Sequence, residues 1–171
     1  MKTLVVSYSF TGNNARLAEG IARQTGADWT KINEKKQRNV FTIVLDVLFN
    51  RTPKIEVPMV SHEAYQRLIF VAPVWLGKVA SPLRAVFKRW KGKVPEYAFV
   101  SISAGADGKA PQLEPELSRR MGLKPVKVVN PLIHHLLPEE PKPSRKELDA
   151  YRLKGDEAET IVREVVNELQ A

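Results

Sequence analysis

The first residues able to do chemistry are 9–14, which read Ser-Phe-Thr-Gly-Asn-Asn. Two hydroxyls and two amides there can donate hydrogen bonds, and Gly12 lets a ligand approach the backbone. Such a group of donors can bind an anion, for example a phosphate. The same residue types also cap helices and form turns, so both interpretations stay open for this segment alone.

Two further segments have compositions that a simple connection does not need. Residues 73–77 place Trp75, a flat aromatic side chain, on a turn between a proline and a glycine. Residues 103–108 are small, which would let a planar ligand contact the backbone. Together the three segments suit a ligand that carries a phosphate at one end and a flat ring at the other.

Alternating strands and helices must position these segments. Apolar runs typical of strands occur at residues 4–6, 68–72 and 97–102, with weaker strand patterns at 29–32 and 126–129. Helical spacing begins at residues 17–22, in a helix expected to end near Gly26, and recurs at residues 81–90, 111–121 and 156–169. Ser81 is predicted to cap the second of these helices. The pattern predicts an α/β fold with a doubly wound, five-stranded parallel sheet of order 2-1-3-4-5 and helices on both faces. In that order the three segments meet at the topological switch point.

Residues 9–14 resemble the phosphate loop of the flavodoxin-like FMN-binding proteins, usually Ser or Thr, any residue, Thr, Gly, Asn and Thr. Residues 73–77 are similar to that family's second flavin loop, and residues 103–108 fall at its third. The resemblance implies FMN as cofactor. The residues that it implies as FMN contacts are Ser9, Phe10, Thr11, Gly12, Asn13, Asn14, Pro73, Val74, Trp75, Leu76, Gly77, Ser103, Ala104, Gly105, Asp107 and Gly108.

Two departures from the family pattern bear on function. Asn14 stands where the family usually has Thr, and residues 103–108 contain no aromatic side chain to cover the outer face of the flavin. The resemblance therefore implies a flavin more open to substrate, with Trp75 against the ring and no catalytic side chain. We expect an oxidoreductase that passes electrons from NAD(P)H to a quinone or another small acceptor. A one-electron carrier that docks to protein partners, and a flavin-free interaction domain, remain the alternatives.

Other chemistries lack their signatures. The chain has no cysteine, so disulfides, thiolate metal sites and cysteine nucleophiles are excluded. No Gly-x-Gly-x-x-Gly follows the first strand, and neither a P-loop nor a Gly-x-Ser-x-Gly motif occurs. His134 and His135 are adjacent rather than at a ligand spacing, so no metal site is predicted.

The 171 residues fit one domain, residues 1–171, with an insert near residues 34–60 and an irregular loop near residues 133–154. No signal region and no apolar run of membrane-spanning length occurs, so we expect a cytoplasmic protein without membrane insertion. Trp29 and Trp90 are expected to pack in the core or at the sheet edge.

The net charge of +8 is unevenly distributed. Residues 78–93 contain six basic and no acidic residues, whereas the charged residues within 156–168 are mostly acidic. Such a basic face can attract nucleic acid, an anionic membrane, an acidic protein or a phosphorylated ligand, but it can also be an ordinary solvated helix face. Because aromatic residues are not interleaved with the basic ones, nucleic acid is not expected as a partner.

Residues 40–49 are strongly apolar on more than one helical face. They form either a helix that packs on its own sheet, which we favour, or a surface for a ligand or a second subunit. A homodimer is therefore a possible assembly.

Overall fold

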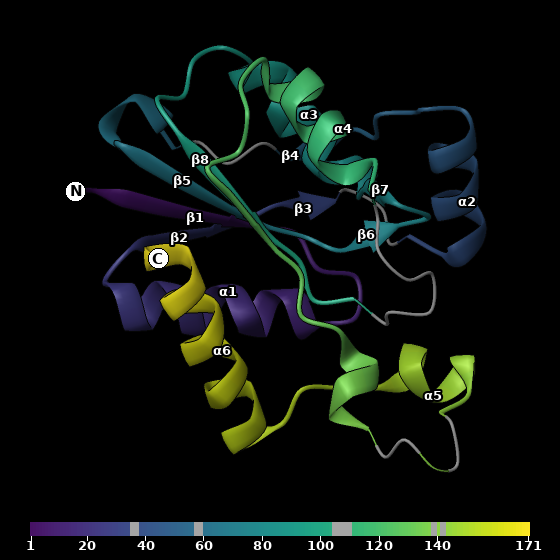
Figure 1. The fold of residues 1–171 in the computed structure, drawn as a ribbon. Coiled ribbons are helices and arrows are strands. Elements are labelled where there is room, and N and C mark those ends of the chain that lie inside the picture. Colours follow the sequence, from purple (N-terminus) through teal and green to yellow (C-terminus); the bar gives the residue numbers. More distant parts are fainter. Residues whose placement is uncertain (35–37, 57–59, 104–110, 138–139, 141–142) are drawn as a thin grey trace.

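The computed structural model describes residues 1–34, 38–56, 60–103, 111–137, 140 and 143–171. A five-stranded parallel sheet forms its centre (Figure 1). In spatial order the strands are β2 (Asp28–Lys31), β1 (Thr3–Ser7), β5 (Arg67–Val71), β8 (Tyr97–Val100) and β9 (Lys127–Val129). This order confirms the predicted 2-1-3-4-5 topology.

Two layers of helices cover the sheet, one on each face (Figure 1). On one face lie α1 (Asn13–Thr25) and α6 (Gly155–Gln170), and on the other α3 (Ser81–Trp90) and α4 (Leu113–Met121). Strand side chains alternate between the two layers, as a sheet buried on both faces requires. Val5 packs toward α1 and α6, whereas Leu4 and Val6 pack toward α3 and α4.

The contact between α1 and α6 depends on a glycine. Gly20 lies in the middle of α1, where a Cβ atom would overlap the Cγ2 atom of Val162 on α6. The absence of a side chain therefore lets the two helices approach closely. Val162 is buried, so this close approach is part of the core on that face of the sheet.

The remaining elements lie between the main strands and helices. They are β3 (Asn33–Glu34), α2 (Val40–Leu48), β4 (Ile55–Glu56), the 3-10 helix η1 (His62–Ala64), β6 (Val74–Trp75), β7 (Lys78–Val79), the 3-10 helix η2 (Ile133–Leu136) and α5 (Arg145–Ala150). The strands β3 and β4 form a separate antiparallel pair. The helix α5, which begins at a capping box between Ser144 and Glu147, was not expected in a segment predicted to be irregular.

Two local predictions were wrong. Ser81 is not the cap of α3: Ala80 takes that position, and Ser81 Oγ donates a hydrogen bond to Asp46 Oδ2 at 3.0 Å. Ser81 is already the first residue of the helix, one position past the cap, and its buried hydroxyl donates to a carboxylate instead. Helix α2 also packs less than expected, because only Ile43, Asp46 and Val47 are buried.

The tryptophans lie as predicted. Trp90 is in the core, where its ring stacks on His62 with centroids 5.1 Å apart. Trp29 is half-buried on the edge strand β2, and its Nε1–H donates to Ser7 Oγ at 2.9 Å. In the part of the chain that the structure describes, no helix is long and apolar enough to cross a membrane.

Candidate functional site

Three loops begin side by side at the carboxyl edge of the sheet. The strands β1, β5 and β8 are hydrogen-bonded neighbours, so the segments that follow them emerge side by side. This is the position at which parallel α/β sheets bind ligands. The sheet edge lies at the right of Figure 1, between α2 and α5.

The first loop leaves the start of α1 open. Gly12 is the N-cap, with a φ of 97°, and no side chain caps the helix. The N–H of Gly12 donates to Ser9 Oγ at 3.0 Å. Among the described residues, no acceptor meets the N–H groups of Asn13, Asn14 and Ala15. Three free donors at the positive end of a helix dipole form a site for an anion.

The side chains of Asn13 and Asn14 do not point to a ligand as the sequence suggested. Asn14 is buried and pairs with the backbone of Ile102, its Nδ2 donating to the carbonyl and its Oδ1 accepting from the N–H, both at 3.0 Å. Asn13 likewise donates to the carbonyl of Tyr151 and accepts from the N–H of Leu153, both at 3.0 Å. The two side-chain amides therefore hold the first loop against neighbouring segments. Of the donors on Asn13 and Asn14, only the backbone N–H groups remain free, among the described residues, to bind an anion.

The second loop is a β-hairpin rather than an irregular turn. Strands β6 and β7 pair antiparallel, and the N–H of Ala80 closes the loop on the carbonyl of Pro73 at 3.1 Å. Its two turn residues, Leu76 and Gly77, have φ values of 49° and 74°. A positive φ is unfavourable for leucine, by about 1–3 kcal/mol, so the surrounding structure holds an exposed leucine in strain at the tip.

Trp75 is half-buried and fixed on several sides. The rings of Tyr8 and Phe10 meet it edge-on, with centroids 5.8 and 6.3 Å away. The guanidinium of Arg38 lies over its ring, 5.8 Å from the centroid. The contact with Phe10 joins the first and second loops, as predicted for a shared site.

Arg38 was not among the predicted site residues. Its guanidinium forms ion pairs with Glu34 and Asp46, and its side chain is only 6% exposed. Tyr8 donates its hydroxyl to Glu34 Oε2 at 2.7 Å. Burial, reinforced by this bond, raises the pKa of Tyr8 and keeps the phenol protonated. The spacing of Glu34 and Arg38 was a weak signal, because a separation of four residues predicts a pair within a helix. Here Glu34 lies on β3 and Arg38 precedes α2.

The third loop is described only at its start. Ser103 extends the pairing of β8 toward the segment after β9: it bridges to Leu132, and its carbonyl accepts from the N–H of Ile133 at 2.8 Å. The other predicted contacts in this loop, Ala104, Gly105, Asp107 and Gly108, lie outside the described residues. Asn14 joins this loop to the first through Ile102, one residue before Ser103.

No protein-family model and no curated protein matches the chain. Solved structures do: a Lactobacillus acidophilus flavoprotein in complex with FMN has a TM-score of 0.67 and 22% identity, over 75% of this chain and 92% of that one. A proposed flavoprotein of Bacteroides uniformis has a TM-score of 0.66 and 18% identity, over 75% and 88% of the two chains. Another, of Bacteroides eggerthii, has a TM-score of 0.62 and 18% identity, over 87% and 94%. The sheet order and these neighbours together show that the chain has the flavodoxin-like fold.

Proposed function

We propose that this protein binds FMN at the carboxyl edge of the sheet and acts as an NAD(P)H-dependent oxidoreductase for a quinone or another small acceptor. One observation supports FMN as the cofactor: the uncapped start of α1, with its free N–H groups, lies beside the hairpin that holds Trp75. The Lactobacillus protein, of similar fold, is described as an FMN complex, which supports the same choice.

The residues present fit both ends of FMN. The backbone N–H groups at the start of α1, with the hydroxyl of Thr11, would hold the phosphate. Trp75 and the strained turn at Leu76 and Gly77 would contact the ring, where aromatic stacking contributes on the order of 1 kcal/mol beyond burial. When bound, FMN would supply the hydride and electron chemistry, and the chain binds and orients it.

The enzyme is favoured over the carrier by charge and by the third loop. A net charge of +8 does not suit docking to basic reductases, the usual partners of acidic flavodoxins. Residues 103–108 carry no aromatic side chain, so nothing in their sequence would stack over the outer face of the ring. That leaves room for a nicotinamide or a quinone.

The visible spectrum of the purified protein tests the cofactor, and anaerobic titration tests the reaction. We expect a yellow protein, or one that FMN turns yellow, which NADPH or NADH bleaches and a quinone restores. A protein that cannot be reconstituted with FMN would refute the proposal. A yellow protein that keeps its colour with both nicotinamides, yet accepts electrons from a photochemical reductant, would instead be a carrier.

Replacement of Trp75 tests the ring end of the site. Trp75→Ala should weaken FMN binding about tenfold, because it removes one stacking surface and loosens the hairpin. Trp29→Ala is the matched control, since Trp29 is also half-buried but lies on the edge strand β2. Binding titrations at equal folded fraction measure both, and equal losses would show that Trp75 is not in the site.

A further inference from the structure

Helix α2 has the reverse of the polarity expected for a helix on the surface of a water-soluble domain. Its outward side is apolar, and its one charged residue, Asp46, points inward and is buried. The outward residues, with their exposed fractions, are Val40 (66%), Phe41 (69%), Val44 (37%), Leu48 (67%) and Phe49 (65%). We call these five residues the α2 face. A surface helix normally turns its polar side to water, so this face is suited to another surface.

The α2 face is held rigidly. Asp46 accepts hydrogen bonds from Ser81 and Arg38, and its carbonyl accepts from Arg84 Nη1 at 3.2 Å. Just after the helix, Asn50 Oδ1 accepts from Arg84 Nη1 at 3.3 Å and from Arg120 Nη2 at 2.7 Å. Arg84 was expected on the basic face, but it is 2% exposed and serves as an anchor. Because the helix is fixed from within, the exposure of its apolar side is a stable property of the fold.

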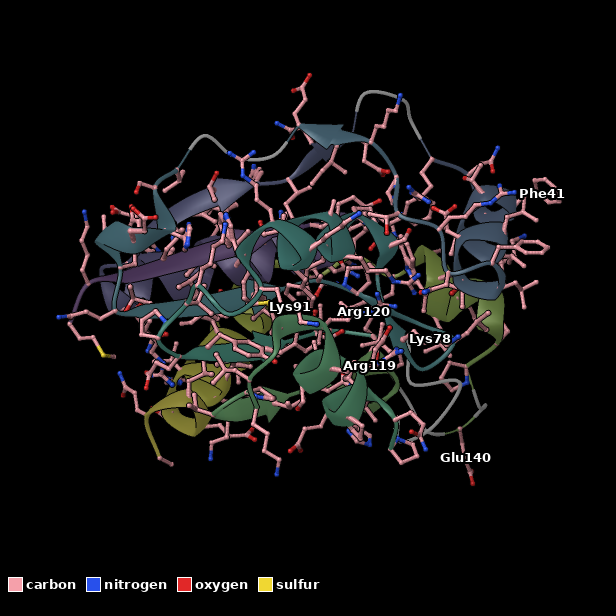
Figure 2. All side chains as sticks on the ribbon, turned by 90° about the horizontal axis from the view of Figure 1, so that it is seen from above. Phe41, Lys78, Lys91, Arg119, Arg120 and Glu140 are labelled. Carbon is pink, nitrogen blue, oxygen red and sulfur yellow. The ribbon has the colours of Figure 1, made fainter. Side chains whose placement is uncertain are left out.

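The chain segments that form α2 and hydrogen-bond to it are basic. Across residues 40–54 and 74–93, Asp46 is the only acidic residue, and it is neutralised by Arg38. Arg51 lies over the ring of Phe49, 5.4 Å from its centroid, and Lys78 is exposed at the start of β7. Figure 2 shows Phe41 projecting at one end of the molecule, with Lys78 and Arg119 lying inward from it.

We propose that the α2 face docks on an anionic membrane surface, with its apolar side chains among the lipid headgroups and Arg51 and Lys78 against lipid phosphates. An apolar helix face with a basic border is the pattern of an interfacial helix. The docking is peripheral and needs no spanning segment.

A second copy of the chain fits the same face less well. In a two-fold dimer the same patch meets itself, so both sides of the interface would carry the basic residues Arg51 and Lys78. The chain already carries a net charge of +8, which adds to the repulsion. An anionic surface removes this cost, and charge complementarity therefore favours lipid over self-association.

Membrane docking would also affect the proposed function, although docking does not depend on FMN binding or on the proposed reaction. Arg38 connects Asp46 of α2 to the ring of Trp75, so the α2 face and the candidate site share one rigid support. A protein held at the membrane by this face would have its site near lipid-soluble molecules. Among small acceptors, a membrane quinone would then be favoured.

Co-sedimentation of the purified full-length protein with vesicles tests the proposal. The protein should bind vesicles of mixed phosphatidylglycerol and phosphatidylcholine, bind pure phosphatidylcholine at least tenfold more weakly, and lose affinity as salt rises. Phe41→Ser and Leu48→Ser should each weaken binding about tenfold. Arg51→Gln and Lys78→Gln should each weaken it about fivefold.

Two controls match these variants. Val126→Ser removes an apolar side chain that is 51% exposed on another part of the surface, and Arg163→Gln removes an exposed charge from α6. Both should bind vesicles as the unchanged protein does. Circular dichroism checks the fold of every variant, and since Phe41 and Leu48 are both exposed, at least one replacement should leave it intact.

Three results would overturn the proposal. One is equal binding to anionic and neutral vesicles, or to neither. Another is a loss of binding in the control variants as large as in Phe41→Ser and Leu48→Ser. The third is a dimer that Phe41→Ser converts to a monomer, without any binding to vesicles. A colourless protein can still bind vesicles, so failure of the FMN proposal is measured separately.

Discussion

Replacing Asn14 by alanine should destabilise the protein before any cofactor is added. The side chain of Asn14 satisfies both backbone groups of Ile102, and it is buried with them. Its removal leaves one N–H and one carbonyl without partners, at a cost of about 1–3 kcal/mol for each buried group. Some water can enter the space, so we expect the free energy of unfolding to fall by about 3 kcal/mol. For a chain of this size that lowers Tm by roughly 6–12 °C.

The assay is urea unfolding of the FMN-free protein, monitored by circular dichroism. Asn14→Asp is the informative second variant, because a protonated aspartic acid can donate from one oxygen and accept at the other, as Asn14 does from its nitrogen and oxygen toward Ile102. Its ionised form instead sets a carboxylate against the carbonyl of Ile102. Burial and this repulsion should raise the pKa of the new carboxyl in the folded state, so the variant should gain stability relative to the unchanged protein as pH falls through that pKa.

A different result would show that the reasoning is wrong. If Asn14 served only as a ligand of phosphate, Asn14→Ala would change the unfolding free energy of the FMN-free protein by less than about 0.5 kcal/mol. FMN binding would then be weakened strongly in a protein of unchanged stability. That outcome would require the Asn14 side chain to leave Ile102 and point into the loop.

Two other predictions concern stability alone. Gly20→Ala should lower the free energy of unfolding by about 1–2 kcal/mol in denaturant titration, because its Cβ would overlap Val162. The double variant with Val162→Ala should lose less stability than the sum of the two single variants. Additive losses would argue against the contact. Tyr65 donates its hydroxyl to Asp28 Oδ2 at 2.8 Å, and this bond lowers the pKa of Asp28 and raises that of Tyr65. The bond therefore stabilises the fold between the unfolded-state pKa values of the two groups, about 4 and 10, and is lost as pH falls through the lowered pKa of Asp28 or rises through the raised pKa of Tyr65. Tyr65→Phe should accordingly be less stable than the unchanged protein at pH 7 and equally stable at strongly acid pH, as urea unfolding at both pH values can show; a constant difference would mean that Asp28 is not the partner.

The sequence alone predicted the order and pairing of the five main strands. Apolar runs at residues 4–6, 68–72 and 97–102 predict buried parallel strands, because a strand covered on both faces has no polar side. Alternation with helices and right-handed crossovers then restricts the strand order. The three loops could be brought to one edge by these rules, and the contact of Phe10 with Trp75 confirms it for the first two.

The tertiary structure decided what the polar side chains do. Asn13 and Asn14 looked like ligand donors, but their partners are backbone groups 88 to 140 residues away along the chain. Ser81 and Arg84 looked like a cap and a surface charge, yet both are buried and bonded to residues of α2. The choice among hydrogen-bond partners depends on which groups burial leaves unsatisfied, and that is fixed only when the distant segments pack together. For the same reason, the spacing of Phe41 and its apolar neighbours could not show that these side chains face outward. Which side of α2 faces the protein is decided by Asp46 and by the arginines that bond to it.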